Sequence, residues 1–259
     1  MSSRKQATPT QSVRFVGSGV IALTSLCASF ETMCGRYVID TNQGQVAARF
    51  EAEISDLGLW TWEPNYNITP MTVVPTIALD GTKARKLVPM RWGLHPHWRK
   101  DMPQGRPLFN ARAETAADKP SFRTPWRRRR ALIPASHWYE WTGEQGGKVP
   151  WCIKPDASPQ ESGLFAFAGL WDQWRVEDGV SLLSCTILTM DSDGPIKRLH
   201  HRMPVRLPET EWAAWLDPDS TAERVLDSAL SADDLIFWEV DRAVNSNRAG
   251  GSALITPAV

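Results

Sequence analysis

The chain has 259 residues, of which 42% are hydrophobic and 13 are Trp, and this composition excludes a disordered or low-complexity protein. Its length suits one large domain or two small ones, with enough residues to bury a sizeable core. The formal net charge is zero, yet residues 82–130 hold 14 Lys and Arg against three acidic residues, so overall neutrality does not exclude a nucleic-acid ligand.

The first 32 residues form a distinct N-terminal stretch. Arg4, Lys5 and Arg14 precede an apolar run at 16–30 that loosely imitates a secretory signal, but Gly, Ser and Thr dilute this run. No apolar run approaches the ~20 residues that a transmembrane helix needs. We therefore expect residues 1–32 to be an extension that is not part of the mature protein, with Met33 beginning a single domain at 33–259.

From Cys34 onward the sequence predicts mainly strands. A strand is predicted at 34–39 and a helix at 42–51. Two apolar segments flank Asp80-Gly81 and predict a β-hairpin. The hairpin strands cover 73–79 and 83–92, and further strands are predicted at 129–141, 149–153, 164–174 and 182–190. Glu177-Asp-Gly is the predicted turn between the last two.

The C-terminal part adds helices to these strands. Pro208 followed by acidic residues predicts a helix that buries Trp212 and Trp215. A second helix near 220–230 and a strand at 237–240 follow. Strands outnumber helices and show no βαβ alternation, so we predict an α+β single domain. Its centre is a largely antiparallel, barrel-like β-sheet with a few flanking helices.

Cys34 is the cysteine with distinctive chemistry. The four cysteines include no Cys-x-x-Cys pair, which indicates neither a zinc ribbon nor a disulfide framework and favours a reducing, cytoplasmic compartment. Cys34 directly follows Met33, whose removal would leave an α-amine beside a thiol. Such a pair condenses with an aldehyde to a thiazolidine, or serves an N-terminal nucleophile hydrolase. An ordinary buried cysteine is the alternative.

Glu140 and His200 are the candidates for proton transfer. Glu140 lies in the run Trp-Tyr-Glu-Trp, and a poorly solvated carboxylate suits proton transfer, whereas a glutamate paired with an arginine is the alternative. His200 is either a general acid or base or a histidine packed at a loop end. Adjacent histidines on a strand or short helix cannot both face one site, so only one of His200 and His201 is expected to act. His95 and His97 lack the neighbours of a metal site.

The basic window 82–130 also carries five aromatic residues among its cations. Cations that follow phosphates and rings that stack on bases suit single-stranded nucleic acid. The alternative is a set of solvated strand ends, above all for the four arginines at 127–130.

Six ordered motifs resemble the SOS-response-associated peptidase (SRAP) family, whose members are abasic-site processing proteins. The resemblance covers roughly residues 33–245. The motifs are Met33-Cys-Gly-Arg-Tyr, Tyr66-Asn-Ile-Thr-Pro70, Met90-Arg-Trp-Gly-Leu94, Asn110-Ala-Arg-Ala-Glu-Thr115, Leu132-Ile-Pro-Ala with Trp-Tyr-Glu-Trp141, and Leu199-His-His-Arg-Met-Pro-Val205. Each motif is weak alone, but the ordered set is specific.

The resemblance implies a covalent crosslink to abasic sites in single-stranded DNA. It implies that Cys34 is the nucleophile, that Glu140 and His200 are catalytic, and that Asn110 lines the pocket. It also implies contacts to the DNA by a larger set: Arg36, Asn67, Pro70, Trp92, Arg112, Trp141, Thr189 and Arg202. Abasic-site lyase and self-processing peptidase activities are further implications. We expect a monomer that needs no metal or organic cofactor, works in the cytoplasm and associates with the nucleoid when bound to DNA.

Two departures from the family pattern lie beside the expected site. His201 stands where an acidic or amide residue is common, and Ser136-His137 replaces the usual Asp-Gly. Two rival functions remain open: a cysteine peptidase acting on other proteins, with Cys34 as nucleophile and His200 as base, and a non-catalytic module that binds single-stranded DNA.

Overall fold

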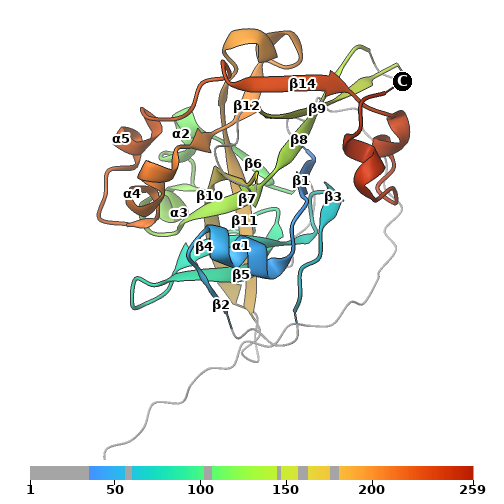
Figure 1. Ribbon diagram of the computed structural model, residues 1–259. Coiled ribbons are helices and arrows are strands. Elements are labelled where there is room, and N and C mark those ends of the chain that lie inside the picture. The colour runs from blue at the N-terminus through green and yellow to red at the C-terminus, as the bar shows by residue number, and fades with distance from the viewer. Residues whose placement is uncertain are drawn as a thin grey trace, which may run out of the picture.

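A computed structural model describes residues 35–55, 60–101, 107–144, 147–156, 163–175 and 181–258 (Figure 1). Cys34, the extension before it and the turn predicted at Glu177 lie outside these ranges. None of the helices within them is long and apolar enough to cross a membrane.

Five strands close into a barrel at the centre of the molecule. They are β4 (Val73–Leu79), β5 (Arg85–Trp92), β7 (Arg130–Ala135), β10 (Phe165–Arg175) and β11 (Ser181–Asp191). Each pairs with its neighbours in the order β11-β10-β7-β4-β5, and a parallel pairing between β5 and β11 closes the ring. The other pairings in the ring are antiparallel. The predicted barrel-like, largely antiparallel sheet is therefore confirmed.

The barrel strands pack closely where β7 and β10 meet. A Cβ atom at Gly169 would lie 2.7 Å from Cγ1 of Ile133, so only glycine fits this position without a shift. Apolar side chains from all five strands are buried around it, because strands enclosed in a barrel turn alternate residues into its interior.

A second, antiparallel sheet packs beside the barrel. Its order is β14 (Leu235–Glu239), β9 (Val149–Pro155), β8 (His137–Thr142), β1 (Tyr37–Ile39) and β3 (Asn65–Ile68). The strand predicted at 129–141 is wrong as a single element, since it divides into β7 and β8 at Ser136. There the chain leaves the barrel, and the Ser136 amide donates to the Val38 carbonyl at 2.8 Å.

Short strands extend the edges of the barrel. These are β2 (Glu53–Ile54), β6 (Asn110–Arg112), β12 (Arg202–Pro204) and β13 (Arg206–Leu207). The strand β6 lies parallel to β11 and pairs Arg112 with Thr189. On the other edge of β11, β12 pairs Arg202 with Asp191. These two short strands bring the Asn110 and His200 motifs to the same end of β11.

The helices are short, and most of them gather on one side of the barrel (Figure 1). They are α1 (Gln43–Arg49), α2 (Ala113–Ala116), α3 (Arg123–Arg128), α4 (Trp212–Leu216) and α5 (Ala222–Leu226), with 3-10 turns η2 (Gly194–Arg198), η3 (Glu209–Glu211), η4 (Arg242–Asn245) and η5 (Ser252–Ile255). A capping box of Asn42 and Gln45 fixes the start of α1. The helix predicted from Pro208 begins as η3, and its burial of Trp212 and Trp215 is confirmed.

Candidate functional site

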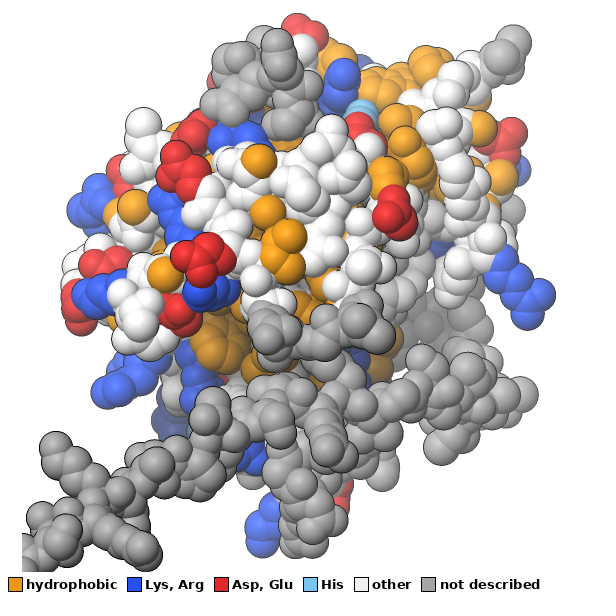
Figure 2. Space-filling model, turned by 60° about the horizontal axis from the view of Figure 1, so that its bottom comes forward, with side chains coloured by type: hydrophobic (Ala, Val, Ile, Leu, Met, Phe, Trp, Pro, Cys, Tyr) orange, Lys and Arg blue, Asp and Glu red, His pale blue; other side chains and the backbone are white. Residues whose placement is uncertain are grey.

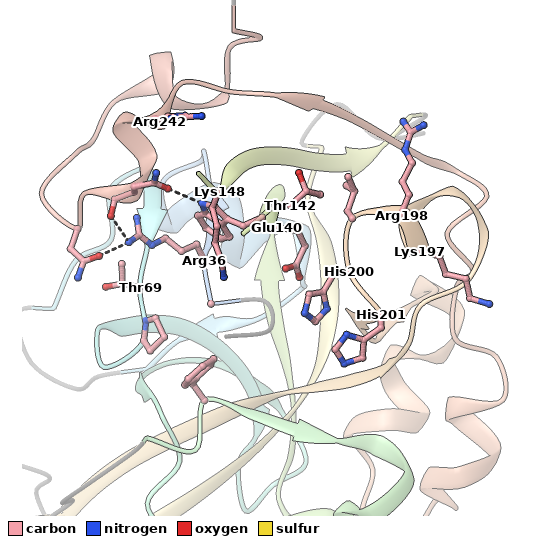
Figure 3. Close-up of a pocket in the computed structure, with 18 residues that line it drawn as sticks. Arg36, Thr69, Glu140, Thr142, Lys148, Lys197, Arg198, His200, His201 and Arg242 are labelled. Atoms are coloured by element: carbon pink, nitrogen blue, oxygen red, sulfur yellow. Dashed lines mark hydrogen bonds between the residues drawn. The ribbon is translucent and has the colours of Figure 1, made fainter. Parts of the chain in front are cut away.

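A cavity of about 1100 Å³ opens between the second sheet, η2 and η4 (Figure 3). Its lining includes five cationic side chains and one carboxylate. The cations are Arg36, Lys148, Lys197, Arg198 and Arg242, and the carboxylate is Glu140. Phe109, Pro70 and Trp141 add apolar surface to the wall. A concave site with this balance of charge attracts an anionic ligand that also has flat apolar parts.

Glu140 is held on β8 with only 1% of its surface exposed. Successive side chains of a strand point to opposite faces. Tyr139 therefore packs into the small apolar cluster behind the sheet, and its hydroxyl donates to the Tyr66 carbonyl at 2.9 Å. Glu140 faces the cavity instead, and its carboxylate points toward the ring of His200 in Figure 3.

His200 follows η2 and is oriented by the main chain of Arg202. The Arg202 amide donates to Nδ1 of His200 at 3.0 Å, and the Arg202 carbonyl lies 3.1 Å from the same nitrogen. The amide can donate to Nδ1 when the ring carries its proton on Nε2, and the carbonyl can accept from Nδ1 when the proton lies there, so the Arg202 main chain offers a partner to either tautomer. The Arg202 main chain thus holds the ring of His200 in place beside Glu140.

Both adjacent histidines line the cavity, contrary to the expectation that only one can face the site. The rings of His200 and His201 stack with their centroids 4.4 Å apart. The expectation fails because this segment is a tight turn between η2 and β12, where neighbouring side chains need not diverge as they do on a strand.

Arg36 ties the cavity to the C-terminal turn. Its guanidinium donates to Asn67 Oδ1 at 2.9 Å and to the Asn245 carbonyl at 3.0 Å, with further bonds to Val244 and Asn247 (Figure 3). Its pKa is lowered by burial. Several N–H groups of Arg36 therefore bind the C-terminal turn and hold this part of the cavity wall in place.

Two more predicted DNA-binding residues support the same turn. Asn67 is buried, and its side-chain amide donates to the Ser246 and Ala249 carbonyls, each at 2.9 Å. The Trp141 indole donates to Asn245 Oδ1 at 2.7 Å and lies under the Arg36 guanidinium at 5.9 Å. Together with Arg36 they hold residues 244–249 against the second sheet.

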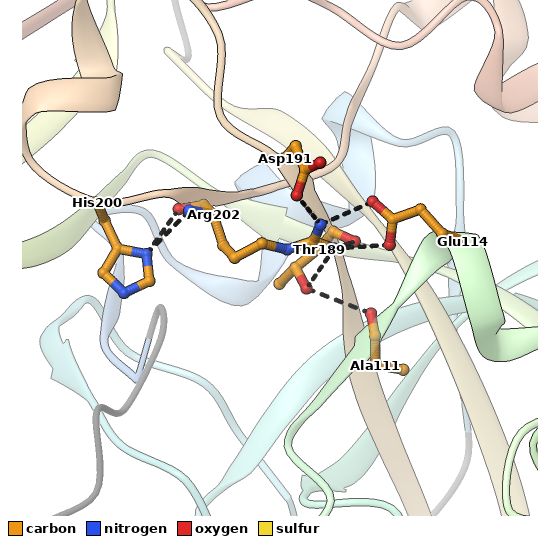
Figure 4. A network of polar contacts seen from close by, with 6 residues as sticks. All are labelled: Ala111, Glu114, Thr189, Asp191, His200 and Arg202. Carbon is orange, nitrogen blue, oxygen red and sulfur yellow. Dashed lines mark hydrogen bonds and ion pairs between the residues drawn. The ribbon is translucent and has the colours of Figure 1, made fainter.

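A polar network joins the Asn110 and His200 motifs at the end of β11 (Figure 4). The Arg202 guanidinium donates to both carboxylate oxygens of Glu114, at 2.7 and 2.8 Å, and also to Asp191 and the Thr189 carbonyl. The hydrogen bond from Arg202 lowers the pKa of Glu114. Asn110 and the exposed Arg112 flank this network on β6.

Three of the residues expected to contact DNA are buried. Trp92 is completely buried, and its indole donates to the Phe109 carbonyl at 2.8 Å, so the ring supports Phe109 from behind. Thr189 is completely buried as well, and Arg202, whose side chain is 5% exposed, is engaged by two carboxylates. None of these three side chains lines the cavity.

The basic window at 82–130 does not supply the cations of the cavity. Among the window residues that the structure describes, 82–101 and 107–130, only Phe109 lines it. Figure 2 shows positive and negative side chains interspersed over one face of the molecule. Within the window Lys83 pairs with Asp217 and Asp219, and Lys86 pairs with Glu53. The cavity cations come from other segments. Two of them, Lys197 and Arg198, directly precede the Leu199-His200 motif, and this adjacency is a signal in the sequence.

Other polar groups fall outside the cavity. The buried carboxylate of Asp172 binds His97 Nδ1 at 2.8 Å and also Arg129. Burial raises the pKa of Cys152 and of Cys185 to about 12, so neither thiol ionises at neutral pH. Across the described segments, no three His, Cys, Asp or Glu side chains gather to hold a metal ion.

Solved structures share this fold. A protein from Bacteroides thetaiotaomicron superimposes with a TM-score of 0.75 at 22% identity, and the match covers 87% of this chain and 100% of the other. A protein from Bordetella bronchiseptica superimposes with a TM-score of 0.64 at 27% identity, covering 80% and 100% of the two chains. The class defined by this fold is an α+β protein on a closed, mostly antiparallel barrel.

The family follows from the sequence comparisons. The model of the family described as SOS response associated peptidase (SRAP) matches residues 33–247, and the chain belongs to that family. The abasic site processing protein YoqW of Bacillus subtilis is 37% identical over 227 residues, which are 86% of this chain and 99% of YoqW. The abasic site processing protein HMCES of Mus musculus is 29% identical over 230 residues, which are 75% of this chain and 65% of HMCES.

Proposed function

We propose that this protein binds single-stranded DNA at an abasic site and joins it covalently through an N-terminal Cys34. The observation that carries the proposal is the meeting of Glu140 and His200 in a cation-lined cavity whose wall includes Gly35. Gly35 is the residue that directly follows Cys34 in the chain, and successive Cα atoms are about 3.8 Å apart. The relatives named as abasic site processing proteins support the same substrate.

The lining of the cavity supports a single strand as the ligand. Five cations provide partners for phosphates, while Phe109 and Trp141 offer rings beside which unpaired bases can lie. We assign phosphate contacts to the cavity cations and to the exposed Arg112. In this proposal Pro70 shapes the wall, and Asn67, Trp92, Thr189 and Arg202 act by supporting residues that face the DNA.

The covalent step uses the aldehyde of the ring-opened abasic deoxyribose. The Cys34 amine attacks the aldehyde carbon, and the carbinolamine loses water to give an imine. The thiol sulfur then adds to the imine carbon, and the nitrogen takes the thiol proton, which closes a five-membered thiazolidine. One water is released overall. Loss of the 3′ phosphate by β-elimination from the imine would give a weak lyase activity.

Glu140 and His200 handle the protons in this scheme. The buried Glu140 carboxylate accepts and returns a proton during ring opening and imine formation. His200, with its proton on Nε2, donates to the oxygen that leaves as water. Asn110 binds the sugar next to the cysteine.

The scheme requires a free α-amine at Cys34, because an amide nitrogen cannot form an imine. We propose that the working protein comprises residues 34–259. Either translation begins at Met33 and this methionine is removed, or the extension is cut off before Cys34, for which self-processing by Cys34 is the candidate route. The intact mass of protein made from its native locus distinguishes a chain that starts at Cys34 from one that retains residues 1–32.

A denaturing gel tests the function against its rivals. The proposal predicts a heat-stable adduct with single-stranded DNA that contains an abasic site and none with intact DNA. A peptidase acting on other proteins would instead form an acyl-enzyme with peptides and no DNA adduct. A binding module would give salt-sensitive binding without any covalent product. Either outcome would overturn the proposal.

A further inference from the structure

The polar network of Glu114, Asp191 and Arg202 lies next to His200 but does not line the cavity (Figure 4). It contains an arginine that is almost wholly buried, and five acceptors surround its guanidinium: both carboxylate oxygens of Glu114, the Asp191 carboxylate, and the carbonyl and hydroxyl of Thr189. A bidentate pair of this kind fixes both the position and the plane of a guanidinium. Burying a charged pair costs desolvation energy that can offset its Coulombic attraction, so this pair is not explained by stability alone.

The main chain of the same arginine is what orients His200. The Arg202 amide and carbonyl both face Nδ1, at 3.0 and 3.1 Å. A neutral ring accepts from the amide, and a protonated ring can donate to the carbonyl. The Arg202 main chain thus offers a partner to Nδ1 in either protonation state, provided that Arg202 stays in place.

We infer that Glu114 is a positioning residue for His200, acting through Arg202. Glu114 lies in the first turn of α2, four residues after Asn110, so the motif that supplies the proposed sugar-binding Asn110 also supplies an anchor for the histidine. Its bidentate bond holds the Arg202 side chain against β11, where Arg202 opens β12 directly after the histidine turn. In this inference the anchor keeps the Arg202 amide on Nδ1 and so keeps the proton of His200 on Nε2. The consequence for catalysis rests on the proposed function.

The first measurement is independent of DNA. Long-range nitrogen–proton spectra of the histidine rings report which nitrogen carries the proton, and a His200→Gln variant assigns the signals. Wild-type protein should show His200 with its proton on Nε2 alone. Glu114→Ala should give a mixture of tautomers, and Glu114→Gln, which keeps the shape and one acceptor, should lie between the two. An unchanged His200 spectrum in Glu114→Ala would overturn the inference.

The second measurement separates rate from affinity. We expect Glu114→Ala to slow single-turnover adduct formation by roughly tenfold, because small misplacement of a reacting group is costly. Its affinity for intact single-stranded DNA should stay within about twofold, since Glu114 does not line the cavity proposed to hold the DNA. A loss of affinity that accounts for the whole loss of rate would make Arg202 a DNA ligand and contradict a positioning role.

A matched control and a fallback keep the test decisive. Glu209 is a half-exposed glutamate whose carboxylate binds the mostly buried Arg49 at 2.9 Å, so Glu209→Gln breaks a similar pair elsewhere and should change neither readout. If Glu114→Ala fails to fold, Asp191→Asn combined with Glu114→Gln weakens the same anchor with less change in shape. Wild-type protein that forms no adduct would defeat the proposed function, while the ring spectra would still decide the role of Glu114.

Discussion

The central residues of the site differ in how they are held. Glu140 is fixed by its strand, buried on the cavity face of β8, whereas His200 is fixed by hydrogen bonds in a turn. A strand position tolerates a change of side chain without a change of backbone. The turn around His200 depends on the side chains that anchor it. Substitutions at Glu140 should therefore change the reaction rate without moving the backbone. Substitutions near His200 should change both the reaction rate and the position of the histidine.

We expect Glu140→Gln and His200→Ala to slow adduct formation by about 100-fold, which is typical for loss of a general acid or base. Affinity for intact single-stranded DNA should fall by less than about threefold, because neither residue is needed to hold phosphates. Single-turnover gels and fluorescence anisotropy measure the two quantities. His97→Gln, which alters a histidine bound to Asp172 away from the cavity, is the control. Equal losses of rate and affinity would count against catalytic roles.

His137 gives the fold a dependence on pH. Its pKa is lowered to about 4, chiefly by burial, with smaller opposing effects of Asp40, which raises it, and Lys154, which lowers it. Its unfolded pKa is about 6.5, so between pH 6.5 and 4 the unfolded chain binds a proton that the folded protein does not. The free energy of unfolding should therefore fall as the pH drops through this window.

His137→Gln removes this titration. Between pH 6.5 and 4 the wild type should lose about 3 kcal/mol more of its unfolding free energy than His137→Gln does. Urea unfolding at both pH values measures the difference, and the variant corrects for carboxylates that titrate in the same range. Parallel losses in the two proteins would show that His137 stays solvated when folded.

At the scale of elements, short 3-10 turns supply three of the cations that line the cavity. The 3-10 turn η2 ends with Lys197 and Arg198 at the cavity, and η4 brings Arg242 to the opposite wall. The helix α3 carries Arg127 and Arg128, which are equally exposed but lie away from the cavity. The pair Lys197 and Arg198 and the pair Arg127 and Arg128 thus carry the same charge but differ in location.

Lys197→Ala combined with Arg198→Ala should weaken binding of single-stranded DNA by roughly tenfold and reduce the salt slope by about 1.4, because two phosphate contacts are lost. Arg127→Ala combined with Arg128→Ala removes the same charge from the basic window and should change neither quantity appreciably. Anisotropy titrations at several salt concentrations compare the two. A larger effect of the Arg127 and Arg128 substitutions would contradict this assignment and would indicate that the DNA binds along the basic window.

The elements also show how far sequence patterns reach. The hairpin around Asp80-Gly81 and the strands at β10 and β11 follow from apolar runs and turn residues, and the structure contains them. The division at Ser136 could not be predicted, because residues 131–135 and the aromatic run around 138–141 are both typical of strands and only pairing with Val38 sends the chain to a second sheet. Strands as short as β6 and β12 leave too little pattern to detect.

At the scale of the whole molecule, the cavity is assembled from segments far apart in the sequence. Its lining comes from the regions around residues 35, 70, 140, 200 and 242. Motifs predicted Glu140 and His200, because each lies in a distinctive run. Of the cavity cations, Arg36 lies in the Met33-Cys-Gly-Arg-Tyr motif and was predicted, whereas isolated residues such as Lys148 and Arg242 carry no local signal. Local charge density favoured residues 82–130, where several cations are paired with acids contributed by other segments.

The covalent role of Cys34 is the central claim, and one gel tests it most directly. Protein that begins at Cys34 is incubated with single-stranded DNA containing one abasic site and then denatured. Cys34→Ala should give no heat-stable adduct, and Cys34→Ser should give only an imine that requires reduction to survive. Cys152→Ala, which removes a buried thiol whose pKa is raised to about 12, should crosslink like the wild type. A heat-stable adduct formed by Cys34→Ala at the wild-type level would contradict the mechanism.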